Sequence, residues 1–374
     1  MKIALVHDYL SQDGGAERVL RAFHEVWPEA PIFVLFYDKN KVAGFENAKI
    51  KESFISKLPM SKKKYQWYLP FMPLANERHN LHNFDIVLSS TSAFAKGILT
   101  RPNTLHISYC HTPTRYLWTD THEYIEDLKY NRLIKSLLPR LIHYLRMWDK
   151  MSVDRVDDFI ANSYNVKGRI QKYYRRDSDV IYPPAEISQF KIADQVGDYF
   201  LAGGRLVPYK KFDLLVKAFN RLGYKLKIFG TGPEMKKLKK MAKSNIEFLG
   251  FISDNEKAEL MSHTRAFLHP QIEDLGITPI ESMASGRPVI AYPVGGVTET
   301  VIHGETGVFF KEQTWESIFD TVIHFNYQDW DSVKIREHAK KFGVDNFKEN
   351  IRKYVEDKYE EFKKGWNQCE LPIK

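Results

Sequence analysis

The feature that most constrains the fold of this chain is an alternation of short apolar segments with longer amphipathic ones. In the first half, the short segments are rich in β-branched and aromatic residues; they are residues 3–7, 31–37, 85–89, 104–109 and 159–162. Segments with helical spacing, residues 16–26 and 166–174, follow two of them. Strands that alternate with helices predict βαβ units and therefore a parallel sheet.

The alternation is interrupted at Pro183 and Pro184, because two consecutive prolines continue neither a helix nor a central strand. It then restarts, with expected strands at residues 200–203, 226–229, 246–249, 266–269 and 289–291 and helices between them. We therefore predict an α/β protein with two doubly wound, Rossmann-like domains. In such a pair, the ligand is expected in a cleft between the domains, at the carboxyl ends of the strands.

Composition narrows the class of protein. Apolar residues make up 43% of the 374 residues and charged residues 27%, which is ordinary globular usage. No run approaches the roughly 18 apolar residues of a membrane span, and the apolar start at residues 3–6 is too short for a signal peptide. Cys110 and Cys369 are too few for a disulfide framework or a cysteine metal cage. We expect a cytoplasmic protein.

Positive charge is concentrated in the first half of the chain. Residues 1–182 contain 27 Lys and Arg against 20 Asp and Glu, whereas residues 183–374 contain 28 against 27. An excess of this kind predicts an anionic partner, which could be a nucleic acid, an anionic membrane surface or a phosphorylated substrate.

Two basic and apolar stretches bear on the choice among these partners. Residues 57–72 place Lys62, Lys63 and Lys64 beside tyrosine, tryptophan and phenylalanine, a mixture typical of a membrane interface; residues 129–150 are a second such stretch. A surface loop and a core-facing helix would have a similar composition. Because no signature of a nucleic-acid-binding module is present, we predict no nucleic acid partner. We predict instead peripheral binding to the inner face of the cytoplasmic membrane, with a glycan or polyprenyl-linked acceptor.

The strongest chemical motif is EDLGITPIE at residues 273–281, between an expected strand and helix. Glu273 is expected in the connecting loop and Glu281 about two turns into the helix. Gly276 and Ile277 would form the helix opening, where backbone N–H groups can approach an anion. Two glutamates alone are more often a loop carboxylate and a surface carboxylate, so the interpretation depends on neighbouring motifs.

Those motifs are basic or glycine-rich. Arg205 and Lys210 follow the first strand of the second domain, where a guanidinium and an ammonium group suit phosphate. In the first domain, Gly14 and Gly15 lie between a strand and a helix and would present bare N–H groups to an anion. The pattern is not G-x-G-x-x-G, which argues against a hydride-transfer enzyme.

In order and spacing, these motifs resemble those of retaining glycosyltransferases of family 4, which have the two-domain GT-B fold. The resemblance runs from Met1 to about residue 345 and includes GGVTE at residues 295–299. The segment CHTPTRYLW at residues 110–118 further resembles the bacterial mannosyltransferase-like branch that builds surface polysaccharides. Leu275 stands where that branch usually has phenylalanine, an apolar-for-apolar change.

The resemblance implies a division of labour. Residues 1–183 would bind the acceptor and residues 184–345 the nucleotide sugar, while a C-terminal helix and tail, residues 346–374, would pack back on the first domain. The implied activity is that of a hexosyltransferase that uses a nucleotide sugar, with mannose from GDP-mannose favoured. The alternatives are a UDP-sugar-dependent transferase, a nucleotide-sugar epimerase or isomerase on the same scaffold, and a nucleotide-binding protein without turnover.

The resemblance also implies residue roles. Glu281 would accept hydrogen bonds from the ribose hydroxyls. Arg205 and Lys210 would bind the diphosphate, together with the two glycine-rich openings at Gly14, Gly15, Gly276 and Ile277. Catalytic roles would fall to these two basic side chains, to Glu273 at the hydroxyls of the donor sugar and to His111 beside the sugar ring.

Asp254 bears on the nucleotide base, because its carboxylate could accept from two donors of guanine, whereas uracil offers one. The same segment, SDNE at residues 253–256, is also good helix-capping sequence. Two Asp-x-Asp strings, at residues 177–179 and 329–331, resemble the metal-binding strings of another glycosyltransferase fold. We interpret both as solvated turns and expect neither a metal ion nor a cofactor beyond the donor.

Overall fold

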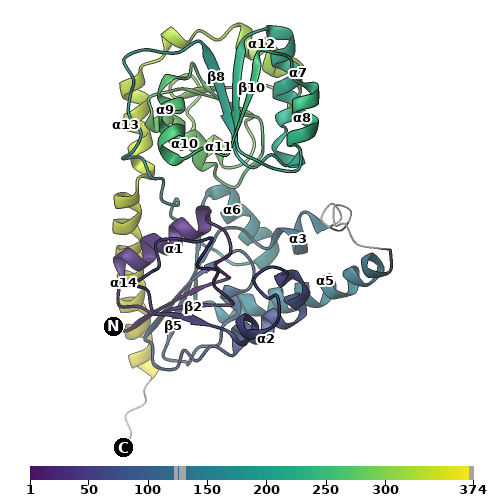
Figure 1. Cartoon of the computed structure of the whole chain (residues 1–374). Coiled ribbons are helices and arrows are strands. Elements are labelled where there is room, and N and C mark those ends of the chain that lie inside the picture. Colours follow the sequence, from purple (N-terminus) through teal and green to yellow (C-terminus); the bar gives the residue numbers. More distant parts are fainter. Residues whose placement is uncertain (122–124, 126–131, 370–374) are drawn as a thin grey trace, which may run out of the picture. The chain divides into compact units, whose positions relative to one another are not determined.

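The computed structural model describes residues 1–121, 125 and 132–369 and divides into two compact units (Figure 1). Unit 1 contains residues 1–184 and 347–374, and unit 2 contains residues 185–346. Each unit is built on one parallel sheet with helices on both faces, as predicted for a doubly wound domain.

The sheet of unit 1 has seven strands in the order β3-β2-β1-β4-β5-β6-β7. All neighbouring strands are parallel. The strands are β1 (Ile3–His7), β2 (Ile32–Val34), β3 (Ile50–Glu52), β4 (Ile86–Thr91), β5 (Leu105–Cys110), β6 (Asp158–Ala161) and β7 (Asp179–Val180). Strands β3 and β7 were not predicted, because they are short edge strands with mostly polar, largely exposed residues and so show no apolar pattern.

Two apolar clusters hold the larger helices of unit 1. One packs α1 (Gly15–Val26) and α14 (Val344–Cys369) on the sheet. Another joins α2 (Met72–Glu77) and α5 (Arg132–Ser152) to the segments that follow β2 and β4. The short helix α3 (Arg115–Trp118) follows β5, and α6 (Tyr164–Arg169) follows β6. The helix predicted at residues 166–174 therefore ends its α-helical part at Arg169 and continues as one π-helical turn.

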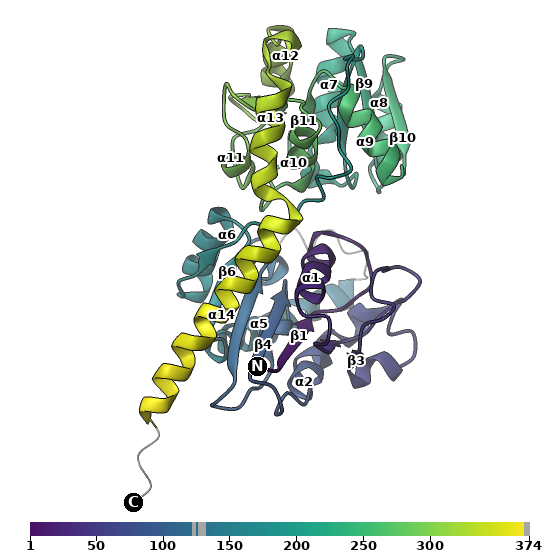
Figure 2. The same cartoon turned by 90° about the vertical axis from the view of Figure 1, so that its left-hand side faces the viewer.

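The C-terminal helix α14 packs on the apolar cluster of unit 1, as predicted (Figure 2). Phe347, Ile351 and Val355 are one turn apart on the helix and are buried in this cluster. The ring of Phe347 stacks on Phe23 of α1 with 5.9 Å between the ring centroids.

Unit 2 has six parallel strands in the order β10-β9-β8-β11-β12-β13. They are β8 (Tyr199–Gly203), β9 (Lys225–Phe229), β10 (Ile246–Gly250), β11 (Phe267–His269), β12 (Val289–Ala291) and β13 (Gly307–Phe309). The last of these strands was not predicted from the sequence.

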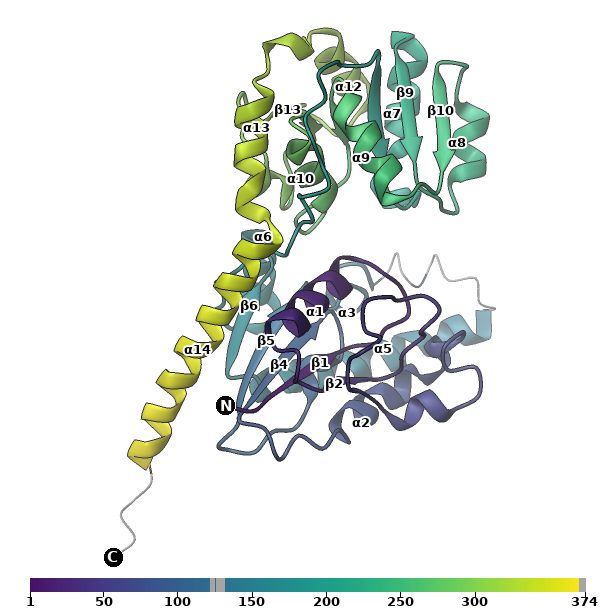
Figure 3. The same cartoon turned by 60° about the vertical axis from the view of Figure 1, so that its left-hand side comes forward.

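Helices cover the two faces of this sheet (Figure 3). One apolar cluster holds α7 (Phe212–Leu222), α8 (Met235–Met241) and α12 (Trp315–Ile323). On the other face are α9 (Asp254–His263), α10 (Ile277–Ala284) and α13 (Ser332–Ala339), and the short helix α11 (Val297–Thr300) follows β12.

The packing of α14 predicts the cost of truncating its buried face. Ile351→Ala should reduce the free energy of unfolding by about 2–5 kcal/mol, because the lost methyl groups leave a cavity in a filled cluster. Urea-induced unfolding measures this difference. Lys353→Ala on the exposed face of the same helix is the control and should change stability by less than about 0.5 kcal/mol. Equal losses in both variants would contradict the packing of α14 on unit 1.

Candidate functional site

In unit 2, most of the predicted site residues follow the carboxyl ends of adjacent strands. Arg205 and Lys210 follow β8, Glu273 follows β11, and Gly295 follows β12. Strands β8, β11 and β12 are neighbours in that order. Because the carboxyl ends of parallel strands share one edge, the loops that carry these residues meet there.

The structure brings Lys210 and Glu273 into direct contact. The Nζ atom of Lys210 lies 2.7 Å from Oε1 of Glu273, and both side chains are largely buried. Gly204 leaves room for the lysine, since a Cβ atom at this position would lie 3.0 Å from Nζ. The contact fixes an ammonium group beside a carboxylate at the end of β8, while the Arg205 side chain is exposed.

The glycines around this pair are required by close backbone approach. The N–H of Gly296 donates to the carbonyl oxygen of Glu273 at 2.9 Å, and a Cβ atom on Gly296 would lie 2.1 Å from the carbonyl oxygen of Asp274. A Cβ atom on Gly230 would lie 1.9 Å from the carbonyl oxygen of Gly204. The motif at residues 295–299 therefore supports the loop that holds Glu273.

His269 belongs to the same cluster and was not predicted. It is the last residue of β11, is fully buried, and has Nε2 4.0 Å from Oε2 of Glu273. Burial lowers its pKa to about 4, so the ring is neutral at pH 7. Among the described residues, neither ring nitrogen has a hydrogen-bond partner. A lone histidine at a strand end carries no distinguishing sequence pattern, which is why it was missed.

The helix opening at residues 276–277 is present. Gly276 has a φ of 86° at the N-terminus of α10, a conformation that favours glycine, and Ile277 is the first helical residue. Glu281 is therefore about one turn into α10, and the expectation of two turns was wrong, because Glu281 is only four positions after Ile277 and one turn takes about 3.6 residues.

Glu281 is buried and pairs with an unpredicted lysine. Its Oε1 atom lies 2.9 Å from Nζ of Lys257 on α9, which is also buried. Lys257 lies 3.2 Å from Asp254 as well. Burying a carboxylate without a partner is costly, so Lys257 explains how Glu281 can occupy this position.

Asp254 is exposed at the start of α9. The helix is capped by Ser253, whose hydroxyl accepts from the N–H of Glu256, while the Glu256 carboxylate accepts from the N–H of Ser253. The capping interpretation of this segment is thus confirmed, whereas contact between Asp254 and a base stays a prediction.

In unit 1, the glycine-rich turn differs from the expectation. Gly14 caps α1, and its N–H donates to Oε2 of Glu17 at 2.9 Å. Glu17 is buried. The prediction that Gly14 presents a bare N–H group to an anion was therefore wrong, because the carboxylate of Glu17, at the third helical position, accepts this N–H. Gly15 is the first residue of the helix.

His111 directly follows β5 and is half-buried. Its Nε2 atom lies 2.8 Å from Oγ of Ser90 on β4, and its backbone N–H donates to Thr91. Burial, together with the nearby His7, lowers the pKa of His111 to about 3, so the ring is neutral at pH 7.

The loop that follows His111 is anchored by a buried ion pair. Asp149 of α5 pairs with Lys96 and accepts hydrogen bonds from Oγ1 of Thr114 at 3.1 Å and Nε1 of Trp118 at 2.8 Å. These contacts bind α5 to both ends of α3 and so restrict the segment that begins at His111.

The two Asp-x-Asp strings have structural contacts. Asp177 lies 3.1 Å from Lys167, and Asp179 accepts a hydrogen bond from Tyr354. Asp331 caps α13. In the described part of the chain, no group of three or more His, Cys, Asp or Glu residues is arranged to hold a metal ion.

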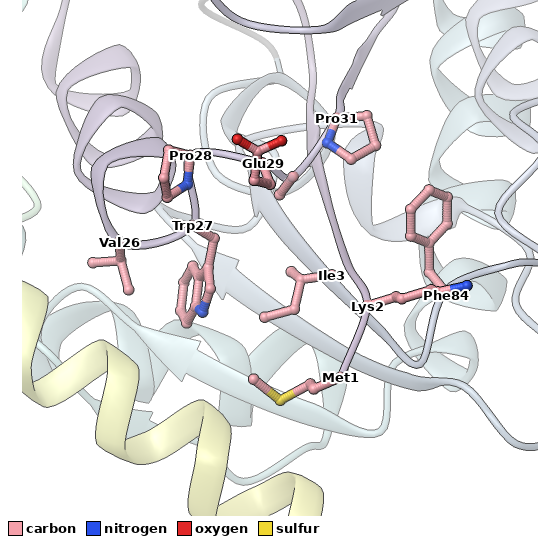
Figure 4. A pocket seen from close by; sticks show the side chains of 10 residues that line it. Met1, Lys2, Ile3, Val26, Trp27, Pro28, Glu29, Pro31 and Phe84 are labelled. Carbon is pink, nitrogen blue, oxygen red and sulfur yellow. The ribbon is translucent and has the colours of Figure 1, made fainter.

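A pocket of about 390 Å³ lies elsewhere in unit 1 (Figure 4). Met1, Ile3, Trp27 and Phe84 line it, and they lie next to the amino ends of β1 and β4. None of the predicted site residues lines this pocket. His111 follows the carboxyl end of β5, at the opposite edge of the sheet.

Two parallel, doubly wound units define a protein of the GT-B class, and solved structures of that class share the fold. The chain superimposes on "Anabaena Alr3699/HepE in complex with UDP-glucose" with a TM-score of 0.69 and 17% identity, over 96% of this chain and all of that one. The model of "Glycosyltransferase Family 4" matches residues 13–189, and that of "Glycosyl transferases group 1" matches residues 185–344. The chain belongs to the family 4 glycosyltransferases.

Curated relatives are more similar in sequence but match over part of their length. "O-antigen chain mannosyltransferase RfbU" of Salmonella typhimurium is 30% identical over 228 residues, which is 57% of this chain and 63% of the relative. "GDP-mannose-dependent alpha-(1-6)-phosphatidylinositol monomannoside mannosyltransferase" of Mycobacterium tuberculosis is 32% identical over 136 residues, 32% of this chain and 35% of the relative. The chain thus spans less than two thirds of the length of these two relatives.

The buried pair in unit 2 predicts a large stability effect. Lys257→Met should reduce the free energy of unfolding by about 3–5 kcal/mol, because Glu281 would lose the charge that compensates its burial. Denaturant unfolding at pH 7 measures the loss. Lys236→Met, at an exposed lysine of α8, is the matched control and should be close to neutral. A wild-type stability for Lys257→Met would show that the pair is not formed.

Proposed function

We propose that this chain is a retaining hexosyltransferase that transfers mannose from GDP-mannose to a glycan or polyprenyl-linked acceptor. The observation that carries the proposal is the Lys210–Glu273 contact at the joined ends of β8, β11 and β12, in a chain of this family. The names of the two curated relatives support mannose as the sugar, and that of the mycobacterial relative supports GDP-mannose as the donor.

The reaction breaks the bond between the sugar C1 and the diphosphate, and the electron pair of that bond leaves with the phosphate oxygen. Positive groups held in place before the reaction stabilise this developing charge. Lys210 is suited to the role because Glu273 orients its ammonium group, and the exposed Arg205 can reach a second phosphate oxygen. The acceptor oxygen then bonds to C1 from the face of the leaving group, and its proton passes to the departing phosphate.

Other residues would position the donor. Glu281 has a carboxylate suited to the ribose hydroxyls, with Lys257 compensating its charge. Glu273 would accept hydrogen bonds from sugar hydroxyls, and His111 would contact the sugar ring. Backbone N–H groups at Gly276 and Ile277 would face the diphosphate. On this mechanism no metal ion is required.

A UDP-sugar is the second candidate donor, because the HepE structure that shares this fold is a complex with UDP-glucose. The two candidates differ in the contact expected of Asp254, which could accept from both the N1–H and the N2–H₂ of guanine. The epimerase alternative would form its product without an acceptor.

A donor panel tests the proposal. We expect GDP-mannose, and none of UDP-glucose, UDP-GlcNAc and UDP-galactose, to raise the melting temperature and to be slowly hydrolysed, with no change on adding EDTA. If a UDP-sugar gives the response instead, the donor is that UDP-sugar and not GDP-mannose. Loss of turnover on adding EDTA would contradict metal independence. Binding without turnover of any donor would contradict the enzymatic proposal.

Arg205→Ala should lower kcat about a hundredfold, the order expected when one charge-stabilising group is lost. Arg221→Ala is the control, since Arg221 is exposed near the C-terminus of α7, away from the carboxyl ends of the strands. Initial rates at saturating donor measure both. A loss of less than tenfold in a folded Arg205→Ala variant would remove this residue from the phosphate site.

The structure of unit 1 adds support for peripheral membrane binding. In residues 57–72, Trp67 and Phe71 are exposed, and Nζ of Lys64 lies 4.3 Å from the centre of the Trp67 ring. Helix α5 shares an apolar cluster with α2, and it also exposes an apolar stripe. The stripe consists of Leu137, Tyr144, Met147 and Met151.

Basic and aromatic side chains of this kind suit an anionic lipid surface. Residues 129–131 of the second basic stretch lie outside the described residues. No helix in the described ranges is both long and apolar enough to span a bilayer.

Reversing the charge of Lys62, Lys63 and Lys64 to glutamate should abolish sedimentation with vesicles that contain anionic lipid, because each basic residue near such a surface contributes about 1 kcal/mol. Hydrolysis of soluble donor should not change. The control reverses three exposed lysines of unit 2, Lys236, Lys239 and Lys240, and should leave sedimentation intact. Unchanged vesicle binding by the first variant would refute the role of residues 57–72.

A further inference from the structure

A network of buried polar side chains connects Glu17, near the start of α1, to His111. Nδ1 of His7, the last residue of β1, lies 3.1 Å from Oγ of Ser90, and the same Oγ lies 2.8 Å from Nε2 of His111. On its other side, Nε2 of His7 lies 3.8 Å from Oε1 of Glu17. His7, Glu17 and Ser90 are buried, so water does not compete for these contacts.

The single hydroxyl proton of Ser90 couples the two rings. The hydroxyl can donate to one imidazole nitrogen, and it must then accept from the other for both contacts to be hydrogen bonds. The proton position on His111 is therefore set by the proton position on His7.

Glu17 decides between the two arrangements. Its Oε1 atom lies 3.8 Å from Nε2 of His7, and a carboxylate there favours a ring proton on Nε2 rather than on Nδ1. Nδ1 of His7 then accepts from Ser90, and the Ser90 oxygen accepts from Nε2–H of His111. This leaves Nδ1 of His111 unprotonated, and among the described residues it has no hydrogen-bond partner.

Ser89, next to Ser90 on β4, and His106 on β5 form a second serine–histidine contact with the opposite arrangement. Oγ of Ser89 lies 2.9 Å from Nε2 of His106, whose Nδ1 lies 2.9 Å from the carbonyl oxygen of Arg155. A carbonyl only accepts, so Nδ1 of His106 carries the proton and its Nε2 accepts from Ser89. Adjacent serines of β4 thus serve two histidines that should be opposite tautomers.

We propose that Glu17, His7 and Ser90 are positioning residues that fix His111 as the Nε2–H tautomer, so that its Nδ1 accepts a hydrogen bond from a hydroxyl of the sugar substrate. The contact with substrate rests on the proposed function, whereas the tautomer does not. Glu17 thus has two contacts: Oε1 faces His7, and Oε2 accepts the N–H of Gly14.

The tautomer can be read directly by long-range ¹H–¹⁵N spectra of the full chain labelled with ¹⁵N-histidine, at neutral pH without donor. His111→Gln and His106→Gln identify the two sets of signals among the 13 histidines. We expect an unprotonated Nδ1 and a protonated Nε2 for His111, and the reverse for His106. A protonated Nδ1 on His111, or a doubly protonated ring, would overturn the proposal. This test needs no substitution of Glu17, His7 or Ser90.

Ser90→Ala tests the connection, and Ser89→Ala is its matched control, because both remove one hydroxyl from a buried serine of β4 that contacts a histidine. Ser90→Ala should convert the His111 signals to a mixture of tautomers and leave those of His106 unchanged. Ser89→Ala should change only the His106 signals. Unchanged His111 signals in Ser90→Ala would refute the proposal that Ser90 transmits the proton position of His7 to His111.

Kinetics separates this proposal from the proposed function. With an active donor, Ser90→Ala should lower kcat by about tenfold or more at similar KM, because a ring in the wrong tautomer presents a donor where an acceptor is needed. If the tautomers are as expected but His111→Gln retains full activity, the proposed contact of His111 with substrate is wrong. The role of Glu17, His7 and Ser90 in setting the tautomer is then still supported. If no donor is turned over, the tautomer result is unaffected.

Discussion

Parallel strand pairing is the constraint on which the arrangement of the candidate site depends. In each sheet all the strands run in one direction, so every loop that follows a strand emerges at the same edge. Residues that are 63 positions apart in sequence, Lys210 and Glu273, meet for this reason at 2.7 Å. The same constraint places His111, at the end of β5, within hydrogen-bond distance of Ser90, near the end of the neighbouring β4.

In each unit, a buried charged side chain is paired with an opposite charge from another element. Lys257 of α9 compensates Glu281 of α10, and Lys96 compensates Asp149 of α5. Burying a single ion is costly, so each pair holds two helices or loops in a fixed relation. The residues placed in this way adjoin the proposed donor site in unit 2 and the His111 loop in unit 1.

Sequence reasoning succeeded where a local pattern carried the information. The break at Pro183 and Pro184 falls where the two compact units divide. The strands β2, β11 and β12 have only three residues but were found, because each is a fully buried apolar run. The missed strands β3, β7 and β13 lie at sheet edges, are only partly buried and so carry a weaker apolar pattern. Gly276 and its helix opening were predicted because a glycine between a strand and a helix is a local feature.

What the sequence determined by itself was therefore the class of fold, the positions of most strand ends and the residue types near them, because hydrophobic period and turn residues are local properties. The contact between the Gly14 N–H and Glu17, three residues away, is local to the start of α1. Tertiary structure alone decided which of the more distant polar groups are already occupied. It paired Glu281 with Lys257 and joined His7 through Ser90 to His111. These partners are distant in sequence, and their hydrogen bonds exist only once the strands and helices that carry them have packed together.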